Sequence, residues 1–148
     1  MSAAATTPAG QGLAQLRREM ARAPYHAFLE PEALTADSAT GLVTIGLKAK
    51  PEFRRAYDSE DWHGGVIAAL IDITAHAAVA VVTGDVAPTI DLRIDYVSAA
   101  SGDLIATGTM IKAGRSIGRS DVAVRDAKNK IVALGRGTFS TLSTPRQS

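Results

Sequence analysis

The sequence predicts an α+β protein in which a curved antiparallel sheet of about six strands wraps around one long buried helix. The apolar segment 64–83 is long enough for about five helical turns, and Gly84 follows it as a C-terminal cap. Because this segment has no hydrophilic face, we expect the helix to be buried on every side. Two strand-like segments precede it, and four more follow it in series, separated by turns. That order is typical of an antiparallel meander wrapped around the helix.

The composition is that of one globular domain, and it excludes several classes of function. The chain has 148 residues, of which 46% are hydrophobic and 21% charged, so it can bury a core. A net charge of +1 lacks the excess of one sign that nucleic-acid and membrane-surface binders concentrate, and aromatic residues, at 5%, offer no stacking platform for bases. The absence of cysteine excludes disulfides, thiol catalysis and thiolate metal sites. We therefore expect no nucleic acid and no membrane as partners, and no metal bound by thiolates; Asp72 and His76, as two possible ligands without a third, are weak evidence for any metal.

Two features of the sequence predict a cytoplasmic location. Residues 1–12 lack the basic start and the apolar stretch of a secretory signal. The longest apolar run, 66–82, contains Asp72 and His76, and a membrane span rarely contains a carboxylate at its centre.

The other elements are predicted from local patterns. Residues 1–12 are interpreted as a flexible tail, and apolar residues at helical spacing follow it until Pro24 ends a short helix. The predicted division is a tail and short helix over 1–23, and a folded domain over 24–145. The predicted strands cover residues 34–39, 42–49, 89–97, 104–112, 116–125 and 131–142.

The last strand carries small residues on one face. Ala133, Gly135 and Gly137 alternate along it, so they point to the same side of the sheet. We expect the long helix to approach the sheet closely over this face.

A short motif opens the long helix. His63, Gly64 and Gly65 precede the apolar segment, and Asp72 follows seven positions after the second glycine. This spacing resembles the helix-opening motif of the hotdog-fold acyl-CoA thioesterases related to phenylacetate degradation. The resemblance runs from about Tyr25 to the last strand and includes residues 91–96, 112–116 and 135–139. It implies hydrolysis of an acyl-CoA to a free acid and coenzyme A, with no cofactor.

The two glycines suit the binding of a developing oxyanion. The first N–H groups of a helix have no intrahelical partner and lie at the positive end of the helix dipole. Gly64 and Gly65 have no side chains that would keep a substrate carbonyl away. The resemblance implies that the Gly64 amide is the oxyanion donor, with Gly65 beside the substrate. The alternative is that the glycines only permit a sharp turn into the helix.

Asp72 is the strongest catalytic candidate. A carboxylate within an apolar helix costs several kcal/mol unless it has a partner or lies in a solvated cleft. The resemblance implies that Asp72 is the catalytic carboxylate, acting either as general base on water or as nucleophile. The alternative is a structural hydrogen bond to Thr74 or His76.

Gly64 and Asp72 are too far apart to act on one carbonyl within a single chain. Eight residues of helix separate them by ~12 Å along its axis. If two copies of the helix pack antiparallel about a two-fold axis, Asp72 of one copy approaches Gly64 of the other. We therefore expect a homodimer with two shared sites, as the resemblance also implies, and further assembly to a homotetramer.

Further residues are assigned by the resemblance. It implies that His63 shapes the catalytic end, although a helix cap is an equal alternative, and that Thr89 orients the water or the carboxylate, although it is also an ordinary strand residue. Lys112, Arg115 and Ser116 correspond to the hairpin that meets the phosphate and pantetheine parts of coenzyme A.

One position departs from the family pattern. Many relatives have an asparagine about six residues before the histidine, where this chain has Tyr57. Tyr57 is therefore the candidate for the missing hydrogen bond to the substrate. His26 and His76 are interpreted as structural histidines. Two other functions stay open at this point: a hotdog enoyl-thioester hydratase or dehydratase, and a non-catalytic acyl-CoA-binding protein.

Overall fold

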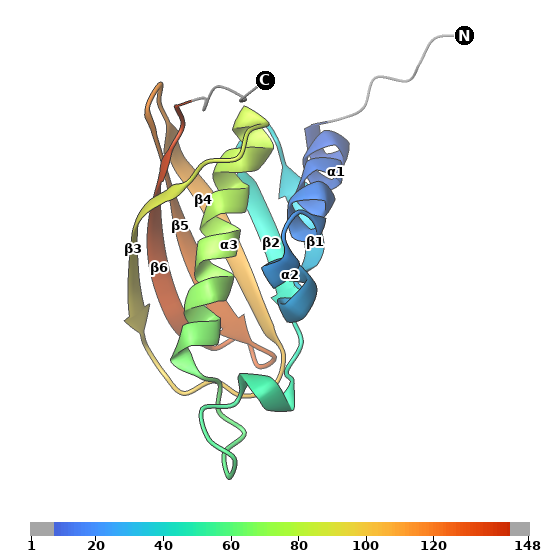
Figure 1. Cartoon of the computed structure of the whole chain (residues 1–148), viewed down its shortest axis with the longest axis vertical. Coiled ribbons are helices and arrows are strands. Elements are labelled where there is room, and N and C mark those ends of the chain that lie inside the picture. The colour runs from blue at the N-terminus through green and yellow to red at the C-terminus, as the bar shows by residue number, and fades with distance from the viewer. Residues whose placement is uncertain (1–7, 143–148) are drawn as a thin grey trace, which may run out of the picture.

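A six-stranded antiparallel sheet curves around the long helix α3, Gly64–Thr83 (Figure 1). The computed structural model describes residues 8–142. The order of strands across the sheet is β1-β2-β4-β5-β6-β3. This arrangement is the predicted α+β hotdog fold. The strands are β1 (Glu32–Asp37), β2 (Leu42–Leu47), β3 (Thr89–Tyr96), β4 (Leu104–Ala113), β5 (Ile117–Asp126) and β6 (Ile131–Ser140).

The N-terminal region is helical from the first described residue. Helix α1, Pro8–Ala21, packs against β1 and α3, and residues 8–12, expected in the tail, form its first turns. The rest of the expected tail, residues 1–7, lies outside the described residues. Gly12 explains why the helix extends so far, because a Cβ at this position would lie 2.8 Å from the Ser38 backbone nitrogen. Close packing on the sheet thus stabilises a segment of weak helix propensity.

Pro24 begins a helix rather than only ending one. It occupies the first turn of α2, Pro24–Leu29, where proline is well tolerated because the first N–H groups of a helix have no partner there. The short 3₁₀ helix η1, Pro51–Phe53, follows β2 and leads to the loop before α3. Neither element was predicted from the sequence.

The position of β3 corrects the predicted meander. We expected four consecutive strands to pair in sequence, but β3 pairs with β6 at the far edge of the sheet, while β4 pairs with β2. The connection 97–103 is too long for a tight hairpin. It passes below the start of α3 instead, where the Trp62 N–H donates a hydrogen bond of 2.8 Å to the Ala100 carbonyl.

Glycines let α3 lie close to the sheet, as predicted for the last strand. A Cβ at Gly135 on β6 would lie 2.4 Å from Ile71 Cγ2, and one at Gly137 would lie 2.9 Å from Ala75 Cβ. Strands β4 and β5 approach the helix in the same way, at Gly108 and Gly118. These positions hold α3 at a distance that no larger side chain would permit.

The expectation that α3 is buried on every side is wrong for its N-terminal half. From Ile73 to Val81 every residue is buried, but Gly65 is exposed, and Ala68 and Asp72 are only half-buried. These three residues lie at helical spacing on one face, which we call the open strip. The sheet covers only the opposite side of this half of the helix, so the protomer leaves a stripe of small residues uncovered.

Among residues 8–142, α3 is the one helix long and apolar enough to span a membrane by length and composition. Two thirds of its most apolar window (67%) is buried in the protein. The core helix of a globular domain has the same properties.

Replacing Gly135 with alanine tests the close packing of α3. We expect Gly135→Ala to lower the free energy of unfolding by about 1–3 kcal/mol, because the new methyl group would overlap the fully buried Ile71 side chain. Gly46→Ala on β2 is the matched control, since its Cβ would lie 3.4 Å from Leu34, an ordinary contact. Urea denaturation of both variants measures the difference, and equal stability of the two would contradict the packing argument.

Candidate active site

The start of α3 is held in place by the loop before it. Trp62 is buried against Phe53, with 5.5 Å between the ring centroids, and its indole N–H donates a 2.7 Å hydrogen bond to the Gly102 carbonyl. The His63 N–H donates to the Phe53 carbonyl at 2.7 Å. The residues just before the helix therefore have a fixed backbone, which positions the first helical N–H groups.

The Gly64 N–H is free at the start of this helix. His63 is the N-cap, and its Nδ1 accepts a 2.9 Å hydrogen bond from the Gly65 N–H. No described residue accepts a hydrogen bond from the Gly64 N–H. The Tyr96 hydroxyl donates to the Gly64 carbonyl at 2.6 Å, so the end of β3 fixes the orientation of this peptide. A pocket of about 330 Å³ opens here, with Gly64, Ile67 and Tyr96 in its lining.

This arrangement distinguishes the two glycines. The cap uses the Gly65 N–H, whereas the Gly64 N–H stays available to an acceptor at the positive end of the α3 dipole. A free, fixed N–H at such a place can stabilise negative charge on a carbonyl oxygen. The structure also places His63 in the capping role that was the alternative to a catalytic one.

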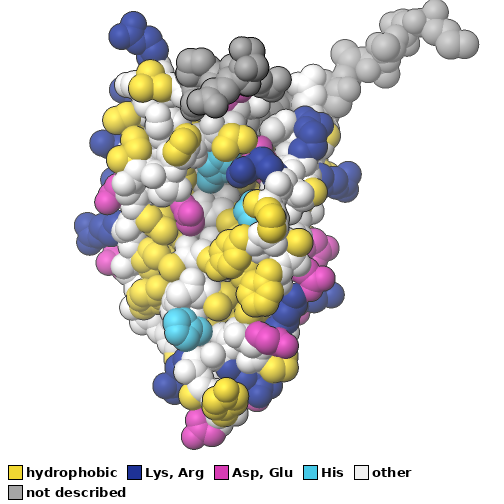
Figure 2. Space-filling model, viewed as in Figure 1, with side chains coloured by type: hydrophobic (Ala, Val, Ile, Leu, Met, Phe, Trp, Pro, Cys, Tyr) yellow, Lys and Arg dark blue, Asp and Glu magenta, His cyan; other side chains and the backbone are white. Residues whose placement is uncertain are grey.

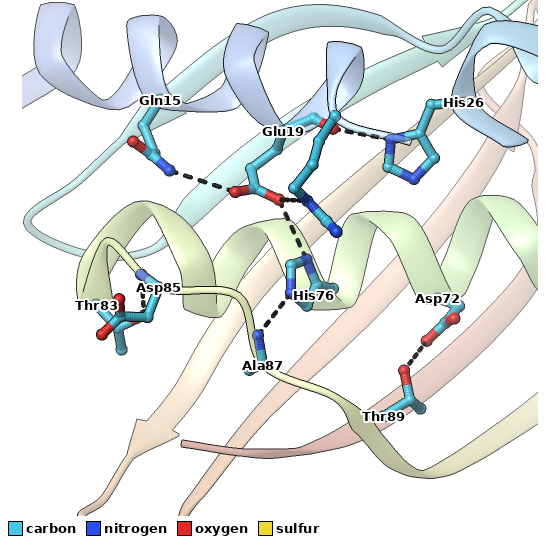
Figure 3. A network of polar contacts seen from close by, with 10 residues as sticks. Gln15, Glu19, His26, Asp72, His76, Thr83, Asp85, Ala87 and Thr89 are labelled. Carbon is cyan, nitrogen blue, oxygen red and sulfur yellow. Dashed lines mark hydrogen bonds and ion pairs between the residues drawn. The ribbon is translucent and has the colours of Figure 1, made fainter. Parts of the chain in front are cut away.

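Asp72 lies on the open strip and contacts β3. The Thr89 hydroxyl donates a 2.9 Å hydrogen bond to Asp72 Oδ1 (Figure 3). The two structural partners considered for Asp72 are engaged elsewhere: Thr74 donates to the Leu70 carbonyl, and His76 accepts from a backbone N–H. The β-bulge between Thr89 and Asp91 interrupts the regular alternation of the strand at this place. The predicted pair of Asp72 and Thr89 is thus brought together.

Gly64 and Asp72 are not brought together within one protomer. Both belong to α3, so ~12 Å of helix separates them. The open strip runs between them, and β3, which flanks it, is the last strand of the described sheet and pairs with one strand, β6. Exposed hydrophobic side chains gather on both sides of the strip, over β3 and over α2 (Figure 2). They include Ile90 of β3 and the stacked pair Tyr25 and Phe28 of α2.

The predicted coenzyme A contacts lie at the other end of the molecule from Gly64. Lys112, Arg115 and Ser116 are exposed on the hairpin between β4 and β5, near the C-terminal end of α3 (Figure 1). Neither cation forms an ion pair with a carboxylate of residues 8–142. Tyr57 lies in the loop before α3 with a fully exposed side chain, and its hydroxyl has no hydrogen-bond partner in the described chain.

A buried polar cluster formed by residues of α1, α2 and α3 was not predicted. Glu19 of α1 is only 3% exposed, and its carboxylate accepts from Gln15 at 3.3 Å and from Arg22 at 3.1 Å. His76 of α3 faces this carboxylate, with 3.6 Å between His76 Nδ1 and Glu19 Oε2 (Figure 3). His26 of α2 donates from Nδ1 to the Glu19 carbonyl at 2.8 Å. His26 and His76 thus both have structural contacts with Glu19, His26 with its backbone carbonyl and His76 with its side-chain carboxylate.

The hydrogen bonds around His76 define the tautomer of its neutral ring. The Ala87 N–H donates to His76 Nε2 at 3.0 Å, so the neutral ring carries its proton on Nδ1, facing Glu19. Burial lowers the pKa of His76, and the charge of Arg22 lowers it further, while the Glu19 and Asp72 carboxylates oppose the shift. The neutral form is the one that can accept the Ala87 hydrogen bond.

Residues 8–142 contain no group of three or more His, Asp or Glu side chains arranged to hold a metal ion. The polar groups of the site are the side chains of Asp72, Thr89 and Tyr96 and the backbone N–H of Gly64.

The sequence matches the Thioesterase superfamily over residues 60–133, the segment that runs from the helix start into β6. A solved structure from the same superfamily is 30% identical, with a TM-score of 0.81, over 87% of this chain and 97% of that chain. The chain therefore belongs to the thioesterase superfamily, and the resemblance seen in the helix-opening motif is confirmed.

Other similar proteins agree with this family. Zebrafish thioesterase superfamily member 2 is 29% identical, with a TM-score of 0.73, over 85% of this chain and 93% of that chain. The Escherichia coli PaaI protein from the phenylacetic acid degradation operon has a TM-score of 0.82 over 93% of this chain and 97% of that chain; at 19% identity it shows the fold alone. A Halobacterium salinarum protein provisionally named an esterase is 39% identical over 90 residues, which span 53% of this chain and 59% of that protein.

Acidification should destabilise the protein through His76. The folded protein binds the His76 proton less tightly than the unfolded chain, whose histidines titrate near pH 6.5. The unfolded state therefore takes up more protons as the pH falls below about 6.5, and stability rises with pH through this interval. We expect urea denaturation between about pH 5.5 and pH 7.5 to show this slope, and His76→Gln to reduce it. Parallel curves for the two proteins would contradict the assignment.

Proposed function

We propose that this protein is an acyl-CoA thioesterase that hydrolyses an acyl-CoA to a free acid and coenzyme A in sites shared between two subunits. The observation that carries the proposal is the free Gly64 N–H at the start of α3, on the same open helix as the Thr89-bonded Asp72. One group suits a developing oxyanion and the other suits the activation of water or direct attack. Membership of the thioesterase superfamily supports hydrolysis as the reaction.

The geometry of α3 supports a two-fold arrangement of the proposed dimer. If Asp72 of one subunit faces Gly64 of the partner subunit, antiparallel helices must cross midway between these positions, at Ala68. Ala68 and Gly65 are small, and neither is fully buried in the protomer. Small side chains at a crossing point let helix axes approach to about 8 Å. The residues that a close crossing requires are thus the residues of the open strip.

The free edge of β3 supports the same arrangement. This strand of eight residues hydrogen-bonds to β6 on one side and to no described strand on the other. A long unpaired edge is a ready template for another strand. A two-fold axis beside the strand would pair it antiparallel with its copy, and would also cover exposed apolar residues such as Ile90.

The proposed reaction begins when the thioester carbonyl oxygen accepts a hydrogen bond from the Gly64 N–H. Asp72 either removes a proton from the attacking water or attacks the carbonyl itself, forming an anhydride that water then opens. The oxyanion forms beside the helix start, the C–S bond breaks, and the thiolate of coenzyme A leaves and takes up a proton. The Thr89 hydroxyl, which donates to Oδ1, holds the Asp72 carboxylate in one orientation.

The hairpin between β4 and β5 suits the phosphates of coenzyme A in this proposal. Lys112 and Arg115 are exposed cations without an ion-pair partner among the described carboxylates. In an antiparallel pair, the partner's helix start lies opposite Asp72, so the loop before it points toward the hairpin end of the first subunit. That loop contains Tyr57, which then has a place beside the bound thioester.

Release of thiol from a panel of acyl-CoAs tests the activity. Because the chain contains no cysteine, every thiol that a chromogenic disulfide reagent detects comes from coenzyme A. Thiol release is the expected result. Consumption of an enoyl group without thiol release would indicate a hydratase instead, and binding without either reaction would indicate a non-catalytic acyl-CoA-binding protein.

Asp72→Asn should keep the fold and lose turnover. The amide oxygen of asparagine can still accept the Thr89 hydrogen bond, but it cannot act as base or nucleophile. We expect kcat to fall by about 10²–10⁴-fold, measured by thiol release and with circular dichroism unchanged. Asp121→Asn is the matched control, because Asp121 pairs with Arg136 on strands β5 and β6 and has no part in the proposed site. Near-normal turnover by Asp72→Asn would remove Asp72 from the mechanism.

Gly64→Pro removes the proposed oxyanion donor while keeping the helix start. Proline lacks the N–H, its φ suits the first helical position, and His63 already has the extended backbone that a following proline requires. We expect kcat to fall by about 10²–10³-fold. Gly64→Ala is the matched control, since it introduces the same Cβ against Tyr96 and keeps the N–H. Equal activity of the two variants would exclude the Gly64 N–H from catalysis.

The same variants test whether the site is shared. A mixed dimer of Asp72→Asn and Gly64→Pro subunits contains one intact site and one doubly altered site. Random reassortment of the two inactive proteins should therefore restore about a quarter of the wild-type activity. If each site lies within one subunit, mixing should restore none.

A further inference from the structure

The buried cluster reaches the proposed site through one backbone hydrogen bond. His76 lies one helical turn after Asp72 on α3, and its Nε2 accepts from the Ala87 N–H at 3.0 Å. Ala87 belongs to the segment 84–88, which links the end of α3 to Thr89, the residue that donates to Asp72. His76 and Thr89 therefore hold the same stretch of chain against α3 from two successive turns (Figure 3).

The segment 84–88 has no regular secondary structure of its own. Ala87 is buried and donates to His76, and the Pro88 carbonyl accepts from the Ser140 N–H of β6 at 2.9 Å. Gly84, by contrast, ends the helix in the left-handed conformation, and Val86 is exposed. The hydrogen bond to His76 is thus one of two that fix the backbone immediately before Thr89.

Glu19 determines which nitrogen of His76 is free to accept that bond. Its carboxylate lies 3.6 Å from Nδ1, so the ring proton is favoured on Nδ1 and the lone pair is left on Nε2. Gln15 and Arg22 donate to the same carboxylate and hold it in place. A proton on Nε2 would face the Ala87 N–H, and two donors would then oppose each other.

We propose that Glu19 and His76 are positioning residues of the thioesterase reaction, which hold the segment 84–88 so that the Thr89 hydroxyl stays on Asp72. The proposal rests on the proposed function, because it requires Asp72 to act in the reaction. It gives helix α1 a part in positioning the catalytic groups, although the described hydrogen bond of the Asp72 side chain is made to Thr89 and not to α1. A purely structural cluster would instead affect stability and leave the turnover of the folded protein unchanged.

Variants at position 76 separate these two roles. We expect His76→Leu, which removes the acceptor of the Ala87 bond, to lower kcat of the folded protein by about tenfold or more with a much smaller change in KM. His76→Gln offers an oxygen acceptor again and should recover part of the loss. Glu19→Gln, which removes the charge facing Nδ1, should lower kcat in the same direction.

Val79→Ala is the matched control for buried damage to the same helix. Val79 is fully buried on α3 against Gly118 of β5, and its apolar side chain cannot hydrogen-bond to the segment 84–88, so its truncation should lower stability without lowering kcat. If His76→Leu does not fold, the kcat of His76→Gln and Glu19→Gln decides the question. A loss of kcat no larger than that of Val79→Ala in these variants would overturn the proposal.

Coupling to Thr89 provides the decisive measurement. If His76 acts through Thr89, the double variant His76→Leu with Thr89→Ala should be no slower than Thr89→Ala alone. Additive losses in kcat would overturn the positioning role. Asp72→Asn distinguishes this failure from failure of the proposed function: an active Asp72→Asn protein refutes the function itself, whereas an inactive one with additive His76 and Thr89 effects refutes only the inference.

Discussion

The incomplete burial of α3, which leaves one face of its N-terminal half open, is the constraint on which the rest of this structure depends. Glycines on β4, β5 and β6 bring the helix close to the sheet, and every residue from Ile73 to Val81 is buried. The N-terminal half has no such cover and exposes Gly65, Ala68 and Asp72. A carboxylate can lie in the middle of an apolar helix because this half stays open. The uncovered strip, the free helix start and the unpaired edge of β3 all result from the same incomplete enclosure.

Elements that depend on local sequence were predictable, and those that depend on distant contacts were not. The length of α3 and the hairpins of β4, β5 and β6 follow from periodicity and turn residues, and their predicted bounds agree with the structure within a few residues. The placement of β3 beside β6 is a pairing between distant segments, which no local pattern encodes. Gly12 in α1 shows the same limit, since the helix is stabilised by a strand that follows much later in the chain.

The same distinction applies to the site. The family resemblance of the helix-opening motif made Gly64 and Asp72 candidates, and the contact between Thr89 and Asp72 agrees with that resemblance. The Tyr96 hydroxyl was missed, because one tyrosine in an alternating strand carries no distinguishing signal. The burial of Glu19 was also missed, because arginines surround it in the sequence, whereas in the structure its carboxylate faces His76 of α3. The burial of this carboxylate can be predicted only when the packing of α1 against α3 is known.

Strand β3 contacts both halves of the candidate site: Thr89 at its beginning meets Asp72, and Tyr96 at its end meets the Gly64 peptide. An edge strand with one hydrogen-bonded neighbour is among the less firmly held parts of a sheet. Any contact that restrains β3 at its unpaired edge would therefore restrain both the Asp72 carboxylate and the Gly64 peptide. In the proposed dimer, separation of the subunits would therefore loosen the Asp72 carboxylate and the Gly64 peptide at the same time, and turnover would fall together with assembly.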